Sequence, residues 1–383
     1  MKLQARILDG IKRVPEHHWN KLETSGNPFV NWHFLNALEA SGSVAAENGW
    51  VPSHFCIYDD DQLLAAMPAY VKMHSRGEFV FDWAWADAYQ RHNLPYYPKL
   101  LTGIPWTPVA GPRLLVDASH PEHKTLRQAL VSAALQFCQK AELSSWHCNF
   151  TTGADNESFR GRDLLHRKDF QFHWHNHDFD GFDEFLSTLK SKKRKNIRHE
   201  RLQVAKAGVR FERKTGGELD GEDIRFMHDC YCRTFHEHGN LPALSLDCFE
   251  MLVATMPESI LAVIASMDDE PLAMSLYFKG DDTLYGRYWG TRQDLPGLHF
   301  ETAYYQGIEY CIEHGLKRFE SGAQGEHKIA RGFEPVATSS YHHIRHPGFR
   351  DAISDYLANE MEWLDDYRSQ VNQHMPFRKA ASG

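Results

Sequence analysis

A glycine-rich polar segment near the C-terminus contains the residue types that proton transfer and anion binding require. Residues 321–333 read SGAQGEHKIARGF, and the glycines are Gly322, Gly325 and Gly332. Glu and His side chains can move protons, whereas Lys and Arg side chains can hold negative charge. The polar residues between the glycines are Gln324, Glu326, His327, Lys328 and Arg331.

Two elements must position this segment. We expect an apolar helix over 300–312 and a short strand over 316–319, directly before it. A glycine-loosened turn after a strand lets backbone N–H groups and side chains converge on one ligand. A polar surface loop with helix-capping glycines is the alternative. We interpret three residues as candidate catalytic groups and two as substrate-binding groups, namely Glu326, His327 and Lys328, with Gln324 and Arg331.

A strongly basic segment lies just past the middle of the chain. Residues 190–214 hold eleven Lys or Arg and two Glu, a local charge of +9 in a protein of net charge −9. We expect a helix over 182–207, capped by Asp180 and ended by Gly208. This charge would suit a phosphate-rich ligand, and a solvated basic face is the alternative. The candidate anion-binding residues are Lys192, Arg194, Lys195 and Arg198.

The segment 81–113 combines seven aromatic residues with five prolines. Because proline restricts loops and aromatic side chains line clefts, this segment could form a pre-shaped acceptor pocket. Asp82 and Asp87 would bind an amine or hydroxyl groups there, and Lys99 and Arg113 would bind phosphate or carboxylate. An aromatic cover over the sheet explains the Trp residues equally well.

Tyr285 and Tyr288 lie in an expected strand over 283–291, where they could meet an acyl donor. Core packing is the stronger interpretation for at least one of them.

His173, His175 and His177 would share one face of an extended segment, as zinc ligands could. The chain has 24 histidines, so such clusters arise by chance and we predict no metal site.

The composition is that of an ordinary globular protein, with 42% hydrophobic and 24% charged residues in a chain of 383. Its net acidity excludes generic nucleic-acid binding by the whole protein. Seven scattered cysteines suit reduced thiols in a cytoplasm. We see no secretory signal and no apolar window long enough to span a membrane, and we therefore expect a cytoplasmic protein.

The chain contains a diverged internal repeat. Each half reads as a hairpin with an Asp-rich turn, an aromatic third strand, a helix and a strand. The paired segments are 54–72 with 262–280, 79–87 with 283–291, and 136–146 with 309–319. The first half carries an insertion over about 88–118. We predict two domains, 1–170 and 171–383.

This order of elements resembles the GNAT acyltransferase fold, and a tandem pair of such units resembles the Fem family of aminoacyltransferases. Three segments are similar to the FemAB-like acyltransferase group, labelled as bacterial peptidoglycan-biosynthesis proteins: YYPKL with PWTPVAGPRLL (96–100 and 105–115), LKSKKRKNIRHERLQVAKAGV (189–209) and GAQGEHKIARGF. The resemblance implies an α+β fold of tandem GNAT-like units, each a mixed sheet with flanking helices. It also implies a lysine in the second unit that assists the reacting carbonyl, for which Lys328 is the candidate by position.

Two departures from these families bear on the acyl donor. Some Fem proteins carry a helical hairpin arm, whereas this chain has only the single basic helix. GNAT proteins that use coenzyme A carry a Q/R-x-x-G-x-G/A loop, where this chain has RQDLPGLHF (292–300) with Pro296 inside it. Aminoacyl-tRNA and acyl-CoA therefore both stay open as donors, and we expect no tightly bound cofactor.

We expect an acyltransferase that moves an aminoacyl or acyl group to an amine of a cell-wall precursor or another small, nucleotide-linked acceptor. One alternative is an acetyl-CoA-dependent N-acetyltransferase. Another is a non-catalytic module that recognises cell-wall precursors or RNA. We expect one site, in the second half, because the matching segment 147–155 of the first half lacks the Lys and His pair.

Overall fold

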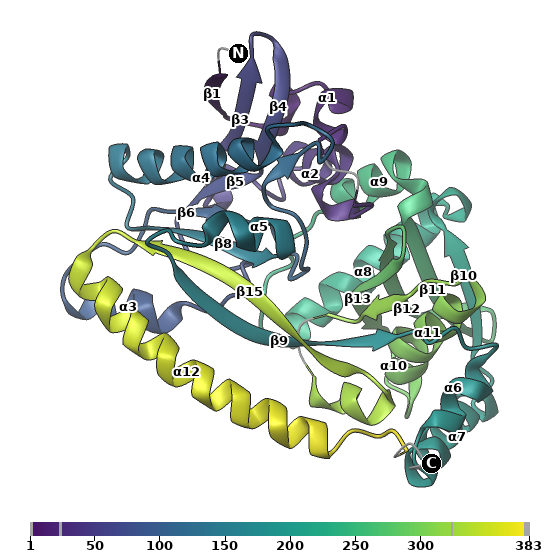
Figure 1. Cartoon of the computed structure of the whole chain (residues 1–383). Helices are drawn as coiled ribbons and strands as arrows, with labels where there is room; N and C mark the ends of the chain where they lie inside the picture. Colours follow the sequence, from purple (N-terminus) through teal and green to yellow (C-terminus); the bar gives the residue numbers. More distant parts are fainter. Residues whose placement is uncertain (1–2, 23–24, 323–324, 379–383) are drawn as a thin grey trace. The chain divides into compact units, whose positions relative to one another are not determined.

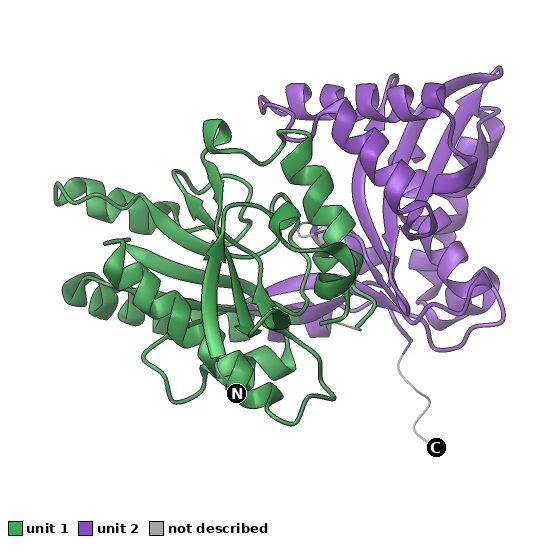
Figure 2. Cartoon of the chain, turned by 90° about the horizontal axis from the view of Figure 1, so that it is seen from above, with its two compact units in different colours: residues 1–169, 337–366 green, residues 170–336, 367–383 purple. Residues whose placement is uncertain are grey.

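The computed structural model (Figure 1) describes residues 3–22, 25–322 and 325–378. The chain divides into two compact units, coloured green and purple in Figure 2. Unit 1 comprises residues 1–169 and 337–366, and unit 2 comprises residues 170–336 and 367–383. The chain thus leaves unit 1, forms most of unit 2, returns to unit 1 for residues 337–366 and ends in unit 2.

Unit 1 contains two groups of strands. Four strands form a sheet in the order β1-β3-β4-β7, and five others pair in the order β15-β8-β6-β5-β2. Within the second group β6 and β8 run parallel and the other neighbours run antiparallel. The strands are β1 (Leu3–Leu8), β2 (Trp50–Pro52), β3 (His54–Asp59), β4 (Gln62–Met67), β5 (Ala69–Lys72), β6 (Lys99–Thr102), β7 (Leu115–Val116), β8 (Ser145–Thr151) and β15 (Glu334–Ile344), whose first three residues belong to unit 2.

The helix α4 (His123–Lys140) supplies one wall of the unit 1 core. Its side chains at Leu126, Leu130 and Ala134 recur at helical spacing and pack with Phe55 and Trp146 from the strands. The other helices are α1 (Glu16–Asn20), α2 (Trp32–Ala40), α3 (Trp83–Arg91), α5 (Gly153–Phe159) and α12 (Pro347–Gln373), whose last turns belong to unit 2.

Unit 2 is built on six strands in the order β10-β11-β12-β13-β14-β9. Neighbouring strands run antiparallel except β13 and β14, which run parallel. The strands are β9 (Leu165–His175, of which 170–175 belong to this unit), β10 (Arg210–Thr215), β11 (Ile260–Met267), β12 (Glu270–Lys279), β13 (Thr283–Thr291) and β14 (Arg318–Glu320).

The core of unit 2 joins this sheet to the helix that follows β13. Tyr277 and Phe319 of the sheet pack with Tyr305 and Ile308 of that helix. The helices are α6 (Phe182–Thr188), α7 (Ser191–Lys206), α8 (Gly221–Glu237), α9 (Leu246–Thr255), α10 (Leu298–Phe300), the π-helix η6 (Glu301–Tyr305), α11 (Gln306–Glu313) and the 3-10 helix η7 (Glu326–Arg331). In the described ranges no helix is long and apolar enough to cross a membrane.

Both expected hairpins are present, β3 with β4 and β11 with β12. Their turns place Asp60, Asp268 and Asp269 at φ values of 51°, 53° and 65°. Asp tolerates this left-handed conformation better than most residues, which explains the Asp-rich turns of the repeat.

The expected third strand of the first half, 79–87, is wrong, because Trp83–Arg91 forms the helix α3. The alternating aromatic residues suggested a strand, yet Phe81 and Trp83 are 51% and 46% exposed. The buried residues are Trp85 and Tyr89, which are four residues apart and pack in one cluster. Burial at helical spacing therefore explains why this segment is a helix. The strand that runs parallel to β8 in unit 1 is β6.

The single helix expected over 182–207 is also wrong, because it is broken into α6 and α7. Between them Leu189 bridges Phe377, and the Lys190 backbone N–H donates to the Pro376 carbonyl over 2.8 Å. This pairing with the C-terminal segment removes two residues from the helix. Gly181, rather than Asp180, caps α6, while Gly208 follows α7 at a φ of 79° as expected.

Candidate active site

The candidate site of unit 2 begins where two parallel strands part. β13 and β14 pair from Thr283 with Arg318 to Tyr285 with Glu320. β13 then continues to Thr291, whereas β14 ends at Glu320. Among the described residues the parallel pairing stops at this point, where a strand edge can meet an extended ligand.

Glu320 is a buried carboxyl group at this end of β14. The residue is 7% exposed, and its Oε2 has no hydrogen-bond partner in the described part of the chain. Burial raises the pKa of Glu320 to about 7, although the charges of Arg318 and Arg287 act in the opposite direction. A carboxyl group in this state can accept a proton near neutral pH.

Lys328 is a buried amine on the 3-10 helix η7. The residue is 1% exposed, and its Nζ donates to the Gly322 carbonyl over 2.7 Å. Burial, assisted by the charge of Arg287, lowers the pKa of Lys328 to about 7. When protonated, such a group can stabilise an oxyanion that develops beside it.

Three groups connect Glu320 with Lys328. Arg287 lowers the pKa of both side chains. His173 Nδ1 lies 3.8 Å from Glu320 Oε1, and burial, followed by the charges of neighbours that include Lys328, lowers the pKa of His173 to about 3. The Gly322 carbonyl that Lys328 binds is two residues after Glu320. Glu320 and Lys328 are thus both buried in unit 2, and the charge of Arg287 acts on both.

Tyr285 lies beside Glu320, whereas Tyr288 packs against α8 and α9. Tyr285 is paired with Glu320 across the two parallel strands and is 6% exposed, and burial raises its pKa. Tyr288 packs against Tyr231 of α8, with ring centroids 4.8 Å apart, and against Phe249 of α9. The structure therefore places only the first of the two near the candidate site.

The remaining residues of the glycine-rich segment have other surroundings. His327 is exposed, and its Nε2 lies 2.9 Å from Tyr304 Oη. Arg331 is bound by Glu200 and Tyr305 and lies over the Phe300 ring. Gln324 lies outside the described residues, as does the side chain of Glu326.

The basic side chains of helix α7 differ in exposure and in their contacts with neighbouring groups. Lys192 and Lys195 are exposed, whereas Arg194 is half-buried with its Nη1 3.4 Å from the Leu189 carbonyl. Arg198 pairs with Asp183 of α6 over 2.8 Å. Of the four predicted anion-binding residues, Lys192 and Lys195 are therefore exposed, whereas Arg194 and Arg198 contact other groups of unit 2.

Of the four residues predicted for the acceptor pocket, two come together in unit 1. Lys99 Nζ binds Asp82 and also Glu78, the latter over 2.8 Å. All three are nearly inaccessible, and Tyr96 Oη donates to Asp82 over 2.5 Å. Arg113 lies apart from this cluster and donates to backbone carbonyls, and Asp87 is exposed on α3.

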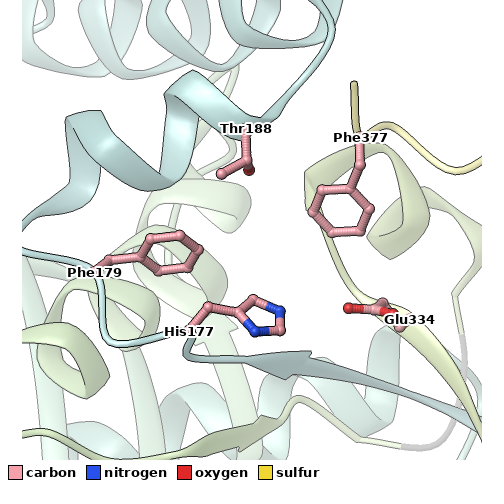
Figure 3. A pocket seen from close by; sticks show the side chains of 5 residues that line it. All are labelled: His177, Phe179, Thr188, Glu334 and Phe377. Atoms are coloured by element: carbon pink, nitrogen blue, oxygen red, sulfur yellow. The ribbon is translucent and has the colours of Figure 1, made fainter. Parts of the chain in front are cut away.

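The three clustered histidines have separate environments. His173 is buried beside Glu320, and His175 is half-buried. His177 lines a cavity of about 210 Å³ (Figure 3), together with Phe179, Thr188, Glu334 and Phe377. In the described part of the chain no three His, Cys, Asp or Glu side chains are grouped as metal ligands.

Sequence reasoning missed Glu320, Ser321 and Arg287. The Oγ of Ser321 is buried and lacks a hydrogen-bond partner among the described residues. One signal was present, since Glu320 stands directly between the expected strand over 316–319 and the glycine-rich segment. A carboxylate that ends a strand before a glycine turn was as strong a candidate as those within the turn.

Comparison with known proteins identifies the family. A model of the FemAB-like family, described as peptidoglycan biosynthesis/recognition, matches residues 10–379. A search of the curated proteins found no match.

Solved structures show the fold. The crystal structure of FemX matches with a TM-score of 0.53 and 12% identity, over 92% of this chain and 100% of that chain. A tandem GNAT protein from the clavulanic acid biosynthesis pathway has a TM-score of 0.45 and 13% identity, over 90% and 99% of the two chains. The C-terminal domain of a putative lysylphosphatidylglycerol synthetase from Agrobacterium fabrum has a TM-score of 0.49 and 10% identity, over 84% and 91%. The expected α+β architecture of two units with mixed sheets and flanking helices is confirmed, and the FemX match shows the same fold.

Proposed function

Because the chain belongs to the FemAB-like family of peptidoglycan biosynthesis and recognition proteins, we propose that it transfers an aminoacyl or acyl group to an amine of a cell-wall precursor. The reaction takes place in unit 2, at the end of the paired strands β13 and β14. The observation that carries this proposal is that Glu320 and Lys328 are both buried in unit 2, both feel the charge of Arg287 and both have a pKa of about 7. Acyl transfer to an amine needs one group that accepts the ammonium proton and one that stabilises the oxyanion of the donor carbonyl. Glu320 and Lys328 supply these two groups.

The steps follow from these two groups. Glu320 takes a proton from the acceptor ammonium, and the free amine attacks the donor carbonyl to form a C–N bond. Protonated Lys328 donates a hydrogen bond to the oxyanion. When the oxyanion collapses, the bond to the donor oxygen or sulfur breaks, and the leaving group takes the proton that Glu320 accepted, which restores the carboxylate. The attacking nitrogen releases its second proton to solvent, so that a neutral amide remains.

The turn before α10 favours aminoacyl-tRNA over acyl-CoA as the donor. Gly297 has a φ of 86°, and a Cβ at this position would lie 3.1 Å from the Glu200 carbonyl of α7. Since α7 packs directly against this helix start, little room is left there for a pyrophosphate. The exposed Lys192 and Lys195 on α7 suit an RNA backbone instead.

A transfer assay tests the proposal. Purified protein is incubated with a nucleotide-linked cell-wall precursor and with either a pool of labelled aminoacyl-tRNA or labelled acyl-CoA. We expect labelled product from aminoacyl-tRNA, and a 10²- to 10⁴-fold lower kcat for Glu320→Gln, as is typical for loss of a general base. Donor and acceptor affinities should change little, because the amide keeps the shape of the carboxyl group.

Each other outcome contradicts a stated part of the proposal. Product from acyl-CoA alone would overturn the choice of donor. Tight binding of the precursor with no product from either donor would favour a recognition module. Full activity in Glu320→Gln would remove this residue as the base and return attention to Glu326 and His327.

A further inference from the structure

We propose that Arg331 and Glu200 are positioning residues that fasten the turn carrying Lys328 to the basic helix α7. The assignment deepens the proposed function, since it concerns how the oxyanion-stabilising amine is held. Its test, however, reads the state of Lys328 directly and needs no turnover.

Arg331 uses its guanidinium group to join four elements of unit 2. The residue is 6% exposed. Its Nη2 donates to both carboxylate oxygens of Glu200 on α7, over 2.8 and 3.0 Å. Its Nε donates to Tyr305 Oη of η6 over 2.9 Å. The guanidinium group also lies over the Phe300 ring of α10, with its carbon 3.3 Å from the ring centroid.

The fourth element is the turn itself. Arg331 Nη1 donates to the His327 carbonyl over 2.9 Å, and His327 directly precedes Lys328. That carbonyl belongs to the peptide bond that ends at the Lys328 nitrogen. The hydrogen bond therefore fixes the backbone from which the buried amine extends to the Gly322 carbonyl.

The π-helix η6 also contacts this turn directly. Tyr304 Oη lies 2.9 Å from His327 Nε2, while the adjacent Tyr305 contacts Arg331 and also donates to Glu200. Single π-helical turns often occur at functional sites, because they redirect consecutive side chains. Here two consecutive tyrosines both hold the Lys328 turn.

The turn also ends under constraint. Gly332 has a φ of 88°, and a Cβ there would lie 2.9 Å from the Phe185 ring of α6. Packing against Phe185 therefore restricts the backbone at Gly332, and the hydrogen bond from Arg331 restricts it at His327. Lys328 lies between the two fixed points.

Arginine is required for this arrangement because a lysine has no planar fork. Arg331→Lys keeps the positive charge but cannot bind Glu200 with two hydrogen bonds and reach Tyr305 and His327 as well. We expect the turn to loosen and water to reach the Lys328 amine. Since burial is the main cause of the low pKa of this amine, hydration should move its titration toward the ordinary range of lysine.

The experiment follows the titration of Lys328 by NMR of protein labelled with 13C in lysine, and Lys328→Arg identifies its signal. The wild-type midpoint should lie near pH 7, and in Arg331→Lys it should rise by roughly one unit or more. The charged groups that act on or near this amine are Arg287, His173, His299 and His327. None of these four groups is substituted in the variant, and position 331 keeps its positive charge, so the shift reports the hydration of the amine.

The matched control is Arg213→Lys. Arg213 also forms several ion pairs in unit 2, with Glu309 and Glu313, but it does not contact η7 in the described structure. Its change should leave the Lys328 midpoint in place even if it lowers the melting temperature. Should Arg331→Lys fail to fold, Glu200→Gln keeps the Tyr305 and His327 contacts of Arg331 and should give a smaller shift in the same direction.

An unchanged Lys328 midpoint in a folded Arg331→Lys or Glu200→Gln protein would overturn the proposal. If the midpoint shifts but neither donor yields product, the positioning role stands and the proposed function fails. If transfer occurs, kcat should fall in Arg331→Lys while the donor KM changes little, because the substitution leaves Lys192 and Lys195 in place.

Discussion

His173 and Glu320 face each other on adjacent antiparallel strands, with Nδ1 3.8 Å from Oε1 and both side chains buried. Burial keeps His173 neutral, since its pKa is lowered to about 3. The imidazole therefore supplies no positive charge to Glu320. This explains how a carboxyl group next to a histidine can keep a raised pKa and still accept protons near neutrality.

Transfer should show a narrow pH optimum near 7. Glu320 acts as a base only when deprotonated, so activity rises as pH passes about 7. Lys328 stabilises the oxyanion only when protonated, so activity falls again above about 7. Measuring kcat/KM from pH 5 to pH 9 should give a bell-shaped curve, whose two limbs belong to the pair of groups.

Lys328→Gln separates the two limbs. Residual activity should be about 10²- to 10³-fold lower, and it should no longer fall at high pH because the titrating amine is absent. A high-pH limb that persists in this variant would assign that limb to another group.

Replacing Glu320 should stabilise the protein, with a defined pH dependence. The folded-state pKa of Glu320 is raised from 4.5 to about 7. Stability that the protonated form contributes is therefore present below pH 4.5 and is lost as pH rises through 7. Glu320→Gln keeps the neutral form at every pH. The variant should match wild type near pH 4 and exceed it by up to about 3 kcal/mol at pH 8.

Denaturant unfolding at the two pH values measures this difference. A gain that is equal at pH 4 and pH 8 would mean that packing, rather than ionisation, separates the two proteins. Together with the loss of transfer, a gain at pH 8 alone would show that the carboxylate is kept for activity at a cost in stability.

Neutralising the start of α7 should weaken binding of tRNA. Changing Lys192, Arg194 and Lys195 to Gln removes three cations that lie close together on one helix. Affinity should fall, and the slope of log K against log salt should decrease by about 2 to 3. Lys12, Lys124 and Lys140 are exposed residues of unit 1, so their triple Gln variant is the control with equal charge loss.

An equal effect of both triple variants would mean that net charge alone governs binding. Arg201 is unsuitable for this test, because it is held by Glu301 and Glu309 and its loss would unpair those carboxylates.

Removing the Lys99 amine should destabilise unit 1. Lys99→Met leaves Glu78 and Asp82 buried without their shared cation, which typically costs about 3–5 kcal/mol. The triple variant Lys99→Met, Glu78→Gln, Asp82→Asn removes all three charges and should recover most of this loss. Free energies of unfolding measure both effects. A Lys99→Met protein of wild-type stability that binds the precursor more weakly would instead support the acceptor pocket predicted from sequence.

The parts of the fold that sequence could predict are those with local signals. Asp-rich turns between apolar runs marked both hairpins, and the apolar run over 300–312 marked the helical segment formed by α10, η6 and α11. The helix α3 could not be predicted, because alternating aromatic residues also fit a strand and only tertiary packing buries Trp85 with Tyr89. The break between α6 and α7 depends on Phe377, nearly two hundred residues away.

The sequence pointed to the glycine-rich segment, but it did not indicate which buried groups surround Lys328. Lys328 was recognised by its place in the glycine-rich segment, and the structure shows it buried beside Gly322. The importance of Glu320 arises from burial and from His173 across the sheet. Burial and a partner across the sheet have no local signal in the sequence, although the place of Glu320 directly before the glycine-rich segment did mark it as a candidate. The role of Arg331 likewise depends on Glu200, which belongs to a different helix.

The path of the chain between the units sets an order of assembly during synthesis. β8 pairs with β15 through contacts such as Cys148 with Tyr341, so unit 1 lacks the strand next to β8 until residue 344 has left the ribosome. By then strands β10 to β14 of unit 2 have all been made. Although unit 1 holds the N-terminus, its sheet is therefore completed last, and a nascent chain stopped at residue 336 would expose the edge of β8 to wrong partners.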